Sequence, residues 1–381
     1  MFLRNCWYIA AYSREVGETP LARTLLGEPV MLYRSEQGEA IALEDRCCHR
    51  NLPLSMGQRE GDDIRCGYHG LKFDRQGQCV EIPGQKEIPP GAKVKNYPAI
   101  EKWNFVWLWM GNPALRDDNL LPHWQCIDDP SLTTTMGNGG QALPMKCNWE
   151  LNNDNLLDLM HVVYVHTDTL GGAGLDRNPV TTERGLTSVR MLRWSPHVEP
   201  PPMLAKLSGF NGKDTDRWQS TLCEIPTHCT IDAGFGAAGT IARDGDWSKG
   251  PRLLALITAT PETETTSFMF YAQCRNFAHG DEALSQGFIK QIRAVFDQDI
   301  AVMEAQQRVN SLLPDAPRIE IRADTPVVAM HRLVEQYAAR EQLEPITVTP
   351  VAPAAPRAPQ PVPASAPAPT AEPIEVGPAS R

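Results

Sequence analysis

The first 112 residues alternate short apolar runs with turn residues, a pattern that is typical of β-strands. We predict strands over residues 29–34, 40–44, 65–73, 78–82 and 104–110. The segments between the first two pairs of strands contain glycine and polar residues, which favour hairpin turns. The last strand is rich in aromatic residues and ends at Gly111-Asn112-Pro113. The pattern therefore predicts an all-β domain over residues 1–112.

The pattern changes in the second part of the chain. Apolar residues recur at helical spacing over 149–166 and 282–313, whereas 252–260 and 267–275 have the composition of buried strands. We predict an α+β fold, in which a domain of helices and sheet over residues 113–343 follows the all-β one. Beyond Leu343 the chain consists mainly of Pro, Ala, Val and Thr, which cannot form a packed core. We predict that residues 344–381 are a disordered Pro/Ala-rich tail.

Composition narrows the classes of partner. The chain has 381 residues, 42% of them hydrophobic, and its 36 basic and 46 acidic residues give a net charge of −10. This charge argues against nucleic acid or an anionic membrane as the main partner. No apolar run reaches the roughly 20 residues of a membrane span, and the N-terminus lacks a leader pattern, so we expect a cytoplasmic protein. The ten cysteines are too sparse for a disulfide scaffold. No GxxxxGK[ST] nucleotide loop occurs, and we expect reducing power to arrive through another protein.

Two cysteine–histidine pairs share one order. Cys47-x-His49 and Cys66-x2-His69 each begin with cysteine and end with histidine, at the tips of predicted hairpins. Two thiolates and two imidazoles suit either zinc or a [2Fe–2S] cluster in which two histidines replace two cysteines on one iron. The shared order favours the cluster, because zinc fingers usually group their cysteines and histidines separately. Cys48 is left over, and we expect it to pack in the core.

A second group of polar residues follows in the predicted helix. Asn155, Asp158 and His161 fall at i, i+3 and i+6, on one stripe of the helix. His166 lies about 140° further round an ideal helix, so the helix must distort or end for both imidazoles to share a metal. Two surface histidines are the alternative. Two histidines with one carboxylate would instead bind non-haem Fe(II) and leave open positions for O2.

The carboxylate comes from the long predicted helix over 282–313. Its apolar positions Phe288, Ile292 and Met303 follow helical spacing, and Asp299 lies within their stripe. A buried carboxylate is costly unless something compensates its charge, and a metal would do so. An ion pair with a nearby arginine is the alternative. Asp297 points away from this stripe and is expected to be a solvated surface charge.

The chain as a whole resembles the oxygenase components of Rieske non-haem iron monooxygenases, the family that includes vanillate and dicamba O-demethylases and toluenesulfonate methyl-monooxygenase. The resemblance rests on the two ligand motifs, extended to Arg50 and Gly70, and on residues 4–8, 81–85 and 260–265. It covers about residues 1–340. It implies a Rieske β-domain joined to a helix-grip catalytic domain, in head-to-tail homotrimers.

The resemblance also implies roles for the polar residues. The implied cluster ligands are Cys47, His49, Cys66 and His69, and the implied iron ligands are His161, His166 and Asp299. Asp158 would accept a hydrogen bond from the ring of His161 and bridge to the cluster ligand His69 of a neighbouring subunit. Asn155 would lie near the iron, although a helix-surface amide is nearly as compatible with its position. Electrons would come from NAD(P)H through a flavin/iron–sulfur reductase, with or without a ferredoxin.

The implied reaction uses O2 to hydroxylate a methyl or methoxy group of an aromatic compound. Family members that act on small aromatic acids carry a pocket histidine on or near the strand that corresponds to 252–260 here. In this chain residues 253–257 are entirely apolar, and residues 267–270 include no histidine. This favours a larger or more apolar aromatic substrate. A ring or angular dioxygenase would use the same ligands. A cluster-only electron carrier or a zinc-binding interaction module would leave the second domain unexplained.

Overall fold

The computed structural model describes residues 1–343 of the chain except 168, 171–177, 213 and 244. Small antiparallel sheets build the N-terminal part of the chain. The first sheet has the order β1 (Trp7–Tyr12), β10 (Phe105–Trp109), β9 (Ala99–Lys102). The second has the order β2 (Leu21–Leu25), β3 (Glu28–Arg34), β4 (Ala40–Glu44). The third has the order β5 (Gln58–Glu60), β6 (Asp63–Arg65), β7 (Lys72–Phe73), β8 (Cys79–Glu81). The predicted all-β N-terminal domain is confirmed, while the predicted tail over 344–381 lies outside the described residues.

One predicted strand is wrong. Residues 65–73 do not form a continuous strand, because β6 ends at Arg65 and β7 begins only at Lys72. The chain between them forms a loop in which the N–H of Cys66 donates to the carbonyl of Leu71 over 2.8 Å. Gly70 has φ 74° in this loop, a left-handed conformation that glycine adopts without strain. The interruption creates the loop that carries Cys66 and His69.

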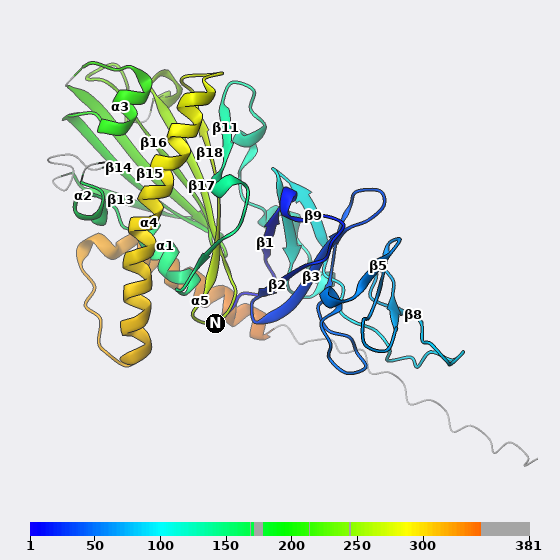
Figure 1. Ribbon diagram of the computed structural model, residues 1–381. Coiled ribbons are helices and arrows are strands. Elements are labelled where there is room, and N and C mark those ends of the chain that lie inside the picture. The colour runs from blue at the N-terminus through cyan, green and yellow to red at the C-terminus, as the bar shows by residue number, and fades with distance from the viewer. Residues whose placement is uncertain (168, 171–177, 213, 244, 344–381) are drawn as a thin grey trace, which may run out of the picture. The chain divides into compact units, whose positions relative to one another are not determined.

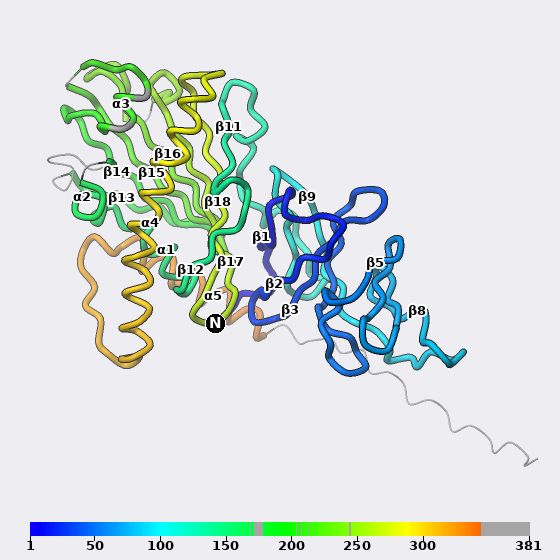
Figure 2. Tube along the Cα trace, viewed as in Figure 1, coloured from blue at the N-terminus to red at the C-terminus, as the bar shows by residue number. Residues whose placement is uncertain are grey.

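An eight-stranded antiparallel sheet dominates the second part of the described chain (Figures 1 and 2). Its order is β11 (Thr133–Met136), β18 (Ser267–Arg275), β17 (Arg252–Pro261), β16 (His228–Ala237), β15 (Thr215–Glu224), β14 (Ser188–Val198), β13 (Val180–Arg184), and β12 (Leu143–Met145) also pairs with β18. The two strands predicted from sequence, β17 and β18, lie next to each other in this sheet. The predicted combination of sheet and helices in the second domain is confirmed.

Helices accompany this sheet. They are α1 (Trp149–Leu157), α2 (His161–Val165), α3 (Pro202–Ser208), α4 (Glu282–Leu312) and α5 (Thr325–Leu343). The long helix α4 runs across one face of the sheet (Figure 1) and buries the predicted apolar stripe, including Phe288, Ile292 and Met303. Its bounds agree with the predicted ones within one residue, whereas α5 was not predicted. Within the described residues, no helix combines the length and the apolar character needed to cross a membrane.

The two faces of strand β17 serve different partners. Leu254 and Leu256 belong to a buried cluster with Trp7 and Trp107 of the N-terminal domain. Because side chains alternate along a strand, Ala255 faces the other side, where it lines a cavity. The sheet therefore separates this cavity from the N-terminal domain of the same chain.

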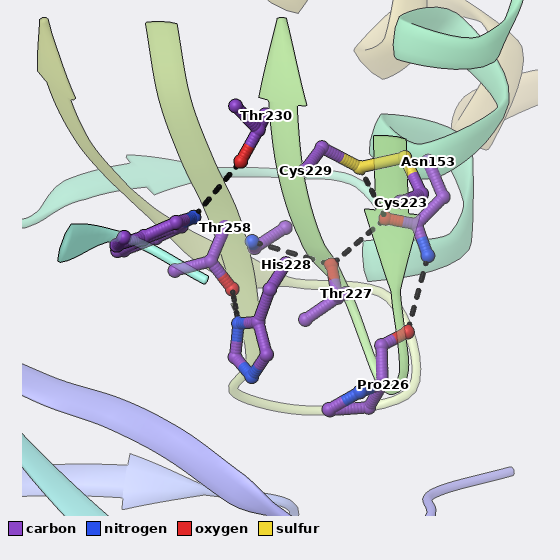
Figure 3. The surroundings of a disulfide bond; sticks show 10 residues. Asn153, Cys223, Pro226, Thr227, His228, Cys229, Thr230 and Thr258 are labelled. Carbon is purple, nitrogen blue, oxygen red and sulfur yellow. Dashed lines mark hydrogen bonds between the residues drawn. A yellow bond between two sulfur atoms is a disulfide. The ribbon is translucent and has the colours of Figure 1, made fainter. Parts of the chain in front are cut away.

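A disulfide between Cys223 and Cys229 closes the turn between β15 and β16 (Figure 3). We did not predict this bond. The antiparallel register places the two cysteines directly opposite each other. Asn153 of α1 holds the same turn, since its Nδ2 donates to the carbonyl of Pro226 over 3.2 Å and its Oδ1 accepts from Thr227 Oγ1 over 2.9 Å. The turn thereby holds the middle of α1, the helix that leads to the polar residues near the cavity.

Candidate metal centres and substrate pocket

The two cysteine–histidine loops have the same hydrogen-bonding pattern. In each loop the N–H of the cysteine donates to the carbonyl five residues later, and its carbonyl accepts from the N–H four residues later. The bonds are Cys47 N to Leu52 O (2.8 Å), Asn51 N to Cys47 O (2.9 Å), Cys66 N to Leu71 O (2.8 Å) and Gly70 N to Cys66 O (3.1 Å). The structure therefore brings the two predicted ligand pairs together on two equivalent loops.

Within this site the thiols lie inside and the imidazoles outside. Cys47 and Cys66 are buried, whereas His49 and His69 are exposed, with ring centroids 4.5 Å apart. Burial and the hydrogen bond to Cys66 raise the pKa of Cys47 to about 11. Thiols next to each other and imidazoles next to each other fit a [2Fe–2S] cluster with both thiolates on one iron. Cys48 is half-buried against the surrounding core, as predicted.

The alternative of zinc fits this arrangement less well. A tetrahedral zinc ion needs all four donor atoms around one point. Among the described residues, the only group of three or more His, Cys, Asp or Glu donor atoms that all lie within 4.8 Å of one another is His161, His166 and Asp299. The donors of the two loops are therefore spread over a larger volume, as a two-iron cluster requires.

The second predicted centre depends on a break in the helix. The predicted continuous helix over 149–166 is wrong, because α1 ends at Leu157 and α2 begins at His161. Asp158 caps α1 in an extended conformation, with φ −104° and ψ 109°. Asn155, Asp158 and His161 therefore do not share one helical stripe. The break reorients the chain so that both imidazoles face α4, which an unbroken helix would not allow.

The two histidines and Asp299 form a compact group. Nε2 of His166 lies 2.9 Å and Nε2 of His161 lies 3.5 Å from Oδ1 of Asp299. Donor atoms at about 2.1 Å from one metal and about 90° apart would lie about 3 Å from each other. His166 and Asp299 are buried, and His161 is largely so. This donor set fits the two-histidine, one-carboxylate centre of non-haem Fe(II) enzymes.

Two amide side chains hold this group. Asn155 Nδ2 donates to Asp299 Oδ1 over 3.2 Å, and Gln298 Oε1 lies 2.8 Å from Nδ1 of His166. Burial lowers the pKa of His166, but hydrogen bonds to Asp299 and Gln298 outweigh it and the pKa is raised. For His161, burial lowers the pKa. Asn155 was predicted near the metal without a definite role, and Gln298 was not predicted, although its position next to Asp299 is a usable signal.

Asp158 does not make the predicted hydrogen bond to His161. Its Oδ2 lies 3.9 Å from Nδ1 of His161, which is beyond hydrogen-bonding distance. Its Oδ1 instead accepts from the N–H of Met160 over 2.7 Å. Nδ1 of His161 is buried and has no hydrogen-bond partner. The side chain of Asp158 is 33% exposed, so its carboxylate can reach both solvent and this ring.

Asp297 lies outside the site, as predicted. Its Oδ1 accepts from Arg293 Nε over 2.8 Å on the exposed face of α4. Because Asp299 is two residues further along the helix, it points in a different direction and enters the cavity.

A cavity of about 110 Å³ adjoins the two histidines and Asp299. Its apolar wall includes Ile231 and Ala233 of β16, Leu253 and Ala255 of β17, and Phe296 of α4. The apolar character predicted for 253–257 is confirmed for the residues of β17 that face the cavity.

The cavity also has polar lining residues. Arg217, Gln219 and Thr221 of β15 and Gln273 of β18 also line it. These residues were not predicted from the sequence, although polar side chains at every second position of a strand are a signal of a polar stripe on one face. The side chain of Arg217 is almost completely buried.

Comparisons with known proteins match both parts of the chain. A model of the Rieske [2Fe–2S] domain matches residues 6–98, and a model of the vanillate O-demethylase oxygenase C-terminal domain matches residues 145–340. The iron–sulfur subunit of a toluene-4-sulfonate monooxygenase system from Comamonas testosteroni is 40% identical over 331 residues, which cover 85% of this chain and 93% of the relative. The oxygenase component of dicamba O-demethylase from Stenotrophomonas maltophilia is 33% identical over 352 residues, which cover 90% of this chain and 99% of the relative.

Solved structures of dicamba monooxygenase have a similar fold. The crystal structure of dicamba monooxygenase bound to 3,6-dichlorosalicylic acid superposes with a TM-score of 0.83 at 30% identity and covers 90% of this chain and 99% of that chain. The structure of dicamba monooxygenase with non-haem iron and dicamba gives a TM-score of 0.77 at 28% identity, with the same coverage.

Proposed function

The chain belongs to the Rieske non-haem iron oxygenases with a vanillate O-demethylase type C-terminal domain, and on this basis we propose that it hydroxylates a methyl or methoxy group of a small aromatic compound as the terminal oxygenase of a multicomponent system. The family carries a [2Fe–2S] cluster and a mononuclear iron. In our proposal Cys47, His49, Cys66 and His69 hold the cluster. His161, His166 and Asp299 hold the iron.

One observation carries this proposal. Two imidazoles and a buried carboxylate converge on one side of a cavity whose remaining wall is largely apolar. This arrangement leaves the cavity side open for O2 and an organic substrate. The bound metals would supply electron transfer and O2 activation, which protein side chains cannot perform.

The protein residues orient the ligands and exclude water. Asn155 holds the carboxylate of Asp299 through Nδ2. When Gln298 Oε1 accepts from Nδ1–H of His166, the lone pair of Nε2 is left for the metal. The apolar side chains of β16 and β17 position the aromatic ring and protect the reacting carbon from bulk water.

Electron delivery favours an oligomer. In one chain the eight-stranded sheet lies between the N-terminal domain and the cavity. The exposed rings of His49 and His69 can instead be reached from outside the chain. We infer a homotrimer in which the cluster of one subunit serves the iron of the next, with Asp158 in the contact. Electrons would come from NAD(P)H through a flavin/iron–sulfur reductase in the cytoplasm, with or without a ferredoxin.

The overall reaction balances with these partners. O2, two electrons and two protons convert a methyl C–H bond to C–OH and release one water. An aryl methyl group then yields the benzylic alcohol. An aryl methyl ether yields a hemiacetal, which collapses to a phenol and formaldehyde.

The test is product analysis with iron-loaded protein, a surrogate reductase, NADH and a panel of methylated and methoxylated aromatics. Formaldehyde or a benzylic alcohol formed in proportion to the NADH consumed supports the proposal. A ring-derived cis-diol or cleavage of a diaryl ether would show instead that the chain is a dioxygenase. Cluster spectra without any oxygenated product from the panel would count against the proposed substrate class.

A further inference from the structure

Two thiols, those of Cys126 and Cys274, lie together outside both proposed metal centres. Cys126 belongs to the short 3-10 helix η5 (Gln125–Asp128), and Cys274 lies on β18. The two side chains are hydrogen-bonded to each other. Oγ1 of Thr134 lies 3.4 Å from Sγ of Cys274. The proposed function uses neither thiol, so their contact needs an explanation of its own.

The packing of the connection between the two domains creates this contact. Cys274 is directly opposite Leu254 of β17, so both side chains point to the face of the sheet that packs on the N-terminal domain. The segment that precedes β11 covers this face. Trp124 is fully buried in the same cluster, and its Nε1 donates to Oγ1 of Thr230 over 3.1 Å. Cys126, two residues further along, is thereby held against β18.

The pair is open to solvent from one side. Cys274 is 0% exposed, whereas Cys126 is half-buried at the edge of the cluster. A small oxidant can therefore reach Cys274 from the side of Cys126. The disulfide-bonded cysteines differ in this respect, because Cys223 and Cys229 are both 0% exposed.

Hydrogen bonding divides the roles of the two thiols. The contact with Cys126 lowers the pKa of Cys274 against the effect of burial, and the contact with Thr134 acts in the same direction. The contact with Cys274, followed by burial, raises the pKa of Cys126. Because a thiolate and not a thiol attacks an oxidant, Cys274 is the nucleophile of the pair. Cys126 keeps its proton and lies next to the sulfur that reacts.

We propose that Cys126 and Cys274 form a reversible disulfide when the protein is exposed to hydrogen peroxide, and that this bond is a redox latch between η5 and the sheet. The inference goes beyond the proposed function, because it assigns a modification site that the oxygenation does not need. The oxidant is compatible with that function, since O2 that takes up two electrons and two protons without oxidising a substrate becomes hydrogen peroxide.

The reaction has two steps. The thiolate of Cys274 attacks one oxygen of the peroxide, the O–O bond breaks, and the hydroxide that leaves takes the proton of Cys126 to form water. The thiolate of Cys126 then attacks the sulfenic acid on Cys274, the S–O bond breaks, and the second hydroxide takes a proton from solvent. Two thiols thus lose two electrons, and one peroxide becomes two waters. A reducing thiol restores the pair by thiol–disulfide exchange.

The latch would join two residues that are far apart in the sequence. A cross-link of this kind stabilises a fold mainly because it restricts the unfolded chain. Cys126 follows the last strand of the N-terminal domain and precedes the first strand of the eight-stranded sheet. The bond would therefore fix the connection between the two domains on the sheet under oxidising conditions.

The first test maps the bond directly. The purified metal-loaded protein is treated with a small excess of hydrogen peroxide, its remaining thiols are alkylated, and it is digested with trypsin. Cleavage after Lys and Arg releases residues 117–146 and 253–275, and each of these peptides contains a single cysteine. Mass spectrometry should find the two peptides linked after peroxide, and separate when dithiothreitol follows the peroxide. Alkylated, unlinked peptides after peroxide would overturn the proposal.

The second test measures what the bond does. Peroxide should raise the melting temperature of the wild-type protein, relative to Cys126→Ser treated in the same way, by at least about 3 °C. Dithiothreitol should abolish this difference. The matched control is Cys147→Ala, which removes a buried cysteine elsewhere and keeps both thiols of the pair, so its melting temperature should respond like that of the wild type. A linked protein without this rise would show that the bond is no latch.

The two tests do not depend on turnover. Peptide mapping of the wild-type protein decides on the bond even if Cys126→Ser does not fold. A linked pair in a protein that oxygenates no aromatic compound would support this inference and count against the proposed function. Oxygenation by a protein whose two peptides stay unlinked would have the opposite meaning.

Discussion

Oε1 of Gln298 lies 2.8 Å from Nδ1 of His166 and can accept a hydrogen bond from its N–H, which would leave the lone pair of Nε2 for a metal ion held together with Asp299. The residue that bonds one proposed metal ligand is thus the neighbour of another in α4. Hydrogen bonds of this kind fix the tautomer and the ring orientation of ligating histidines.

Replacing Gln298 by Leu should therefore weaken binding of the mononuclear iron by about 10- to 100-fold, because the ring of His166 loses its fixed tautomer. The measurement is a competition titration of Fe(II) with a chromophoric chelator, using protein whose cluster content is determined from its visible spectrum. The control is Gln286→Leu, an exposed glutamine of the same helix that bonds Glu282. Equal iron affinity in all three proteins would show that Gln298 does not position the ligand.

Asp299 and Asp297 form a matched pair two residues apart. Asp299→Ala should lose mononuclear iron and turnover but retain the colour and EPR signal of the cluster. Asp297→Ala should retain both metals, since it removes only an exposed ion pair with Arg293. Iron counts and EPR spectra of the two variants provide the measurement. Full activity of Asp299→Ala would move the third ligand to another carboxylate, such as Glu304.

Sequence patterns predicted the parts of the site that depend on spacing. The spacing within each pair, Cys47 with His49 and Cys66 with His69, predicted a shared site correctly because each pair lies on one tight loop. The apolar stripe of α4 located Asp299 because helical periodicity continues over 31 residues. Local rules were sufficient wherever a single element carries the chemistry.

Tertiary relationships could not be predicted in the same way. Residues 149–166 have a helical pattern throughout, and only the extended conformation of Asp158 shows that the helix ends before His161. Arg217 and Gln273 meet at one cavity because strands β15 and β18 belong to one sheet, which no local pattern reveals. The bond between Cys223 and Cys229 likewise depends on the register of two strands.

Imidazole ligation should set the potential of the cluster. Replacing His69 by Cys should lower the reduction potential by a few hundred millivolts, because clusters with histidine ligands have higher potentials than clusters with four thiolates. Spectroelectrochemical titration measures the shift, and the EPR spectrum should change with it. His279→Cys, which adds an exposed cysteine outside the two loops, is the control. An unchanged potential and spectrum in His69→Cys would contradict the assignment of His69 as a ligand.

Asp158 gives the test most specific to electron transfer. Its carboxylate is 33% exposed and lies 3.9 Å from the buried, unpartnered Nδ1 of His161. A neighbouring subunit that presents the ring of His69 at this point would place the carboxylate between two imidazole N–H groups and shorten the route for the electron. Asp158→Asn keeps the size of the side chain and one acceptor but loses the charge that orients both rings. We expect both metals to bind and the oligomer to form, while electron transfer between the metals slows by at least about 100-fold, the upper end of the effect of losing a residue that orients a metal ligand.

The measurement is a single turnover of prereduced protein with substrate and O2, followed through cluster oxidation and product. The control is Asp154→Asn in α1, the helix that Asp158 caps, where the carboxylate of Asp154 bonds His331 on α5. Cluster oxidation at the wild-type rate in Asp158→Asn would refute the bridge, whereas a cluster that stays reduced beside fully loaded iron would support it.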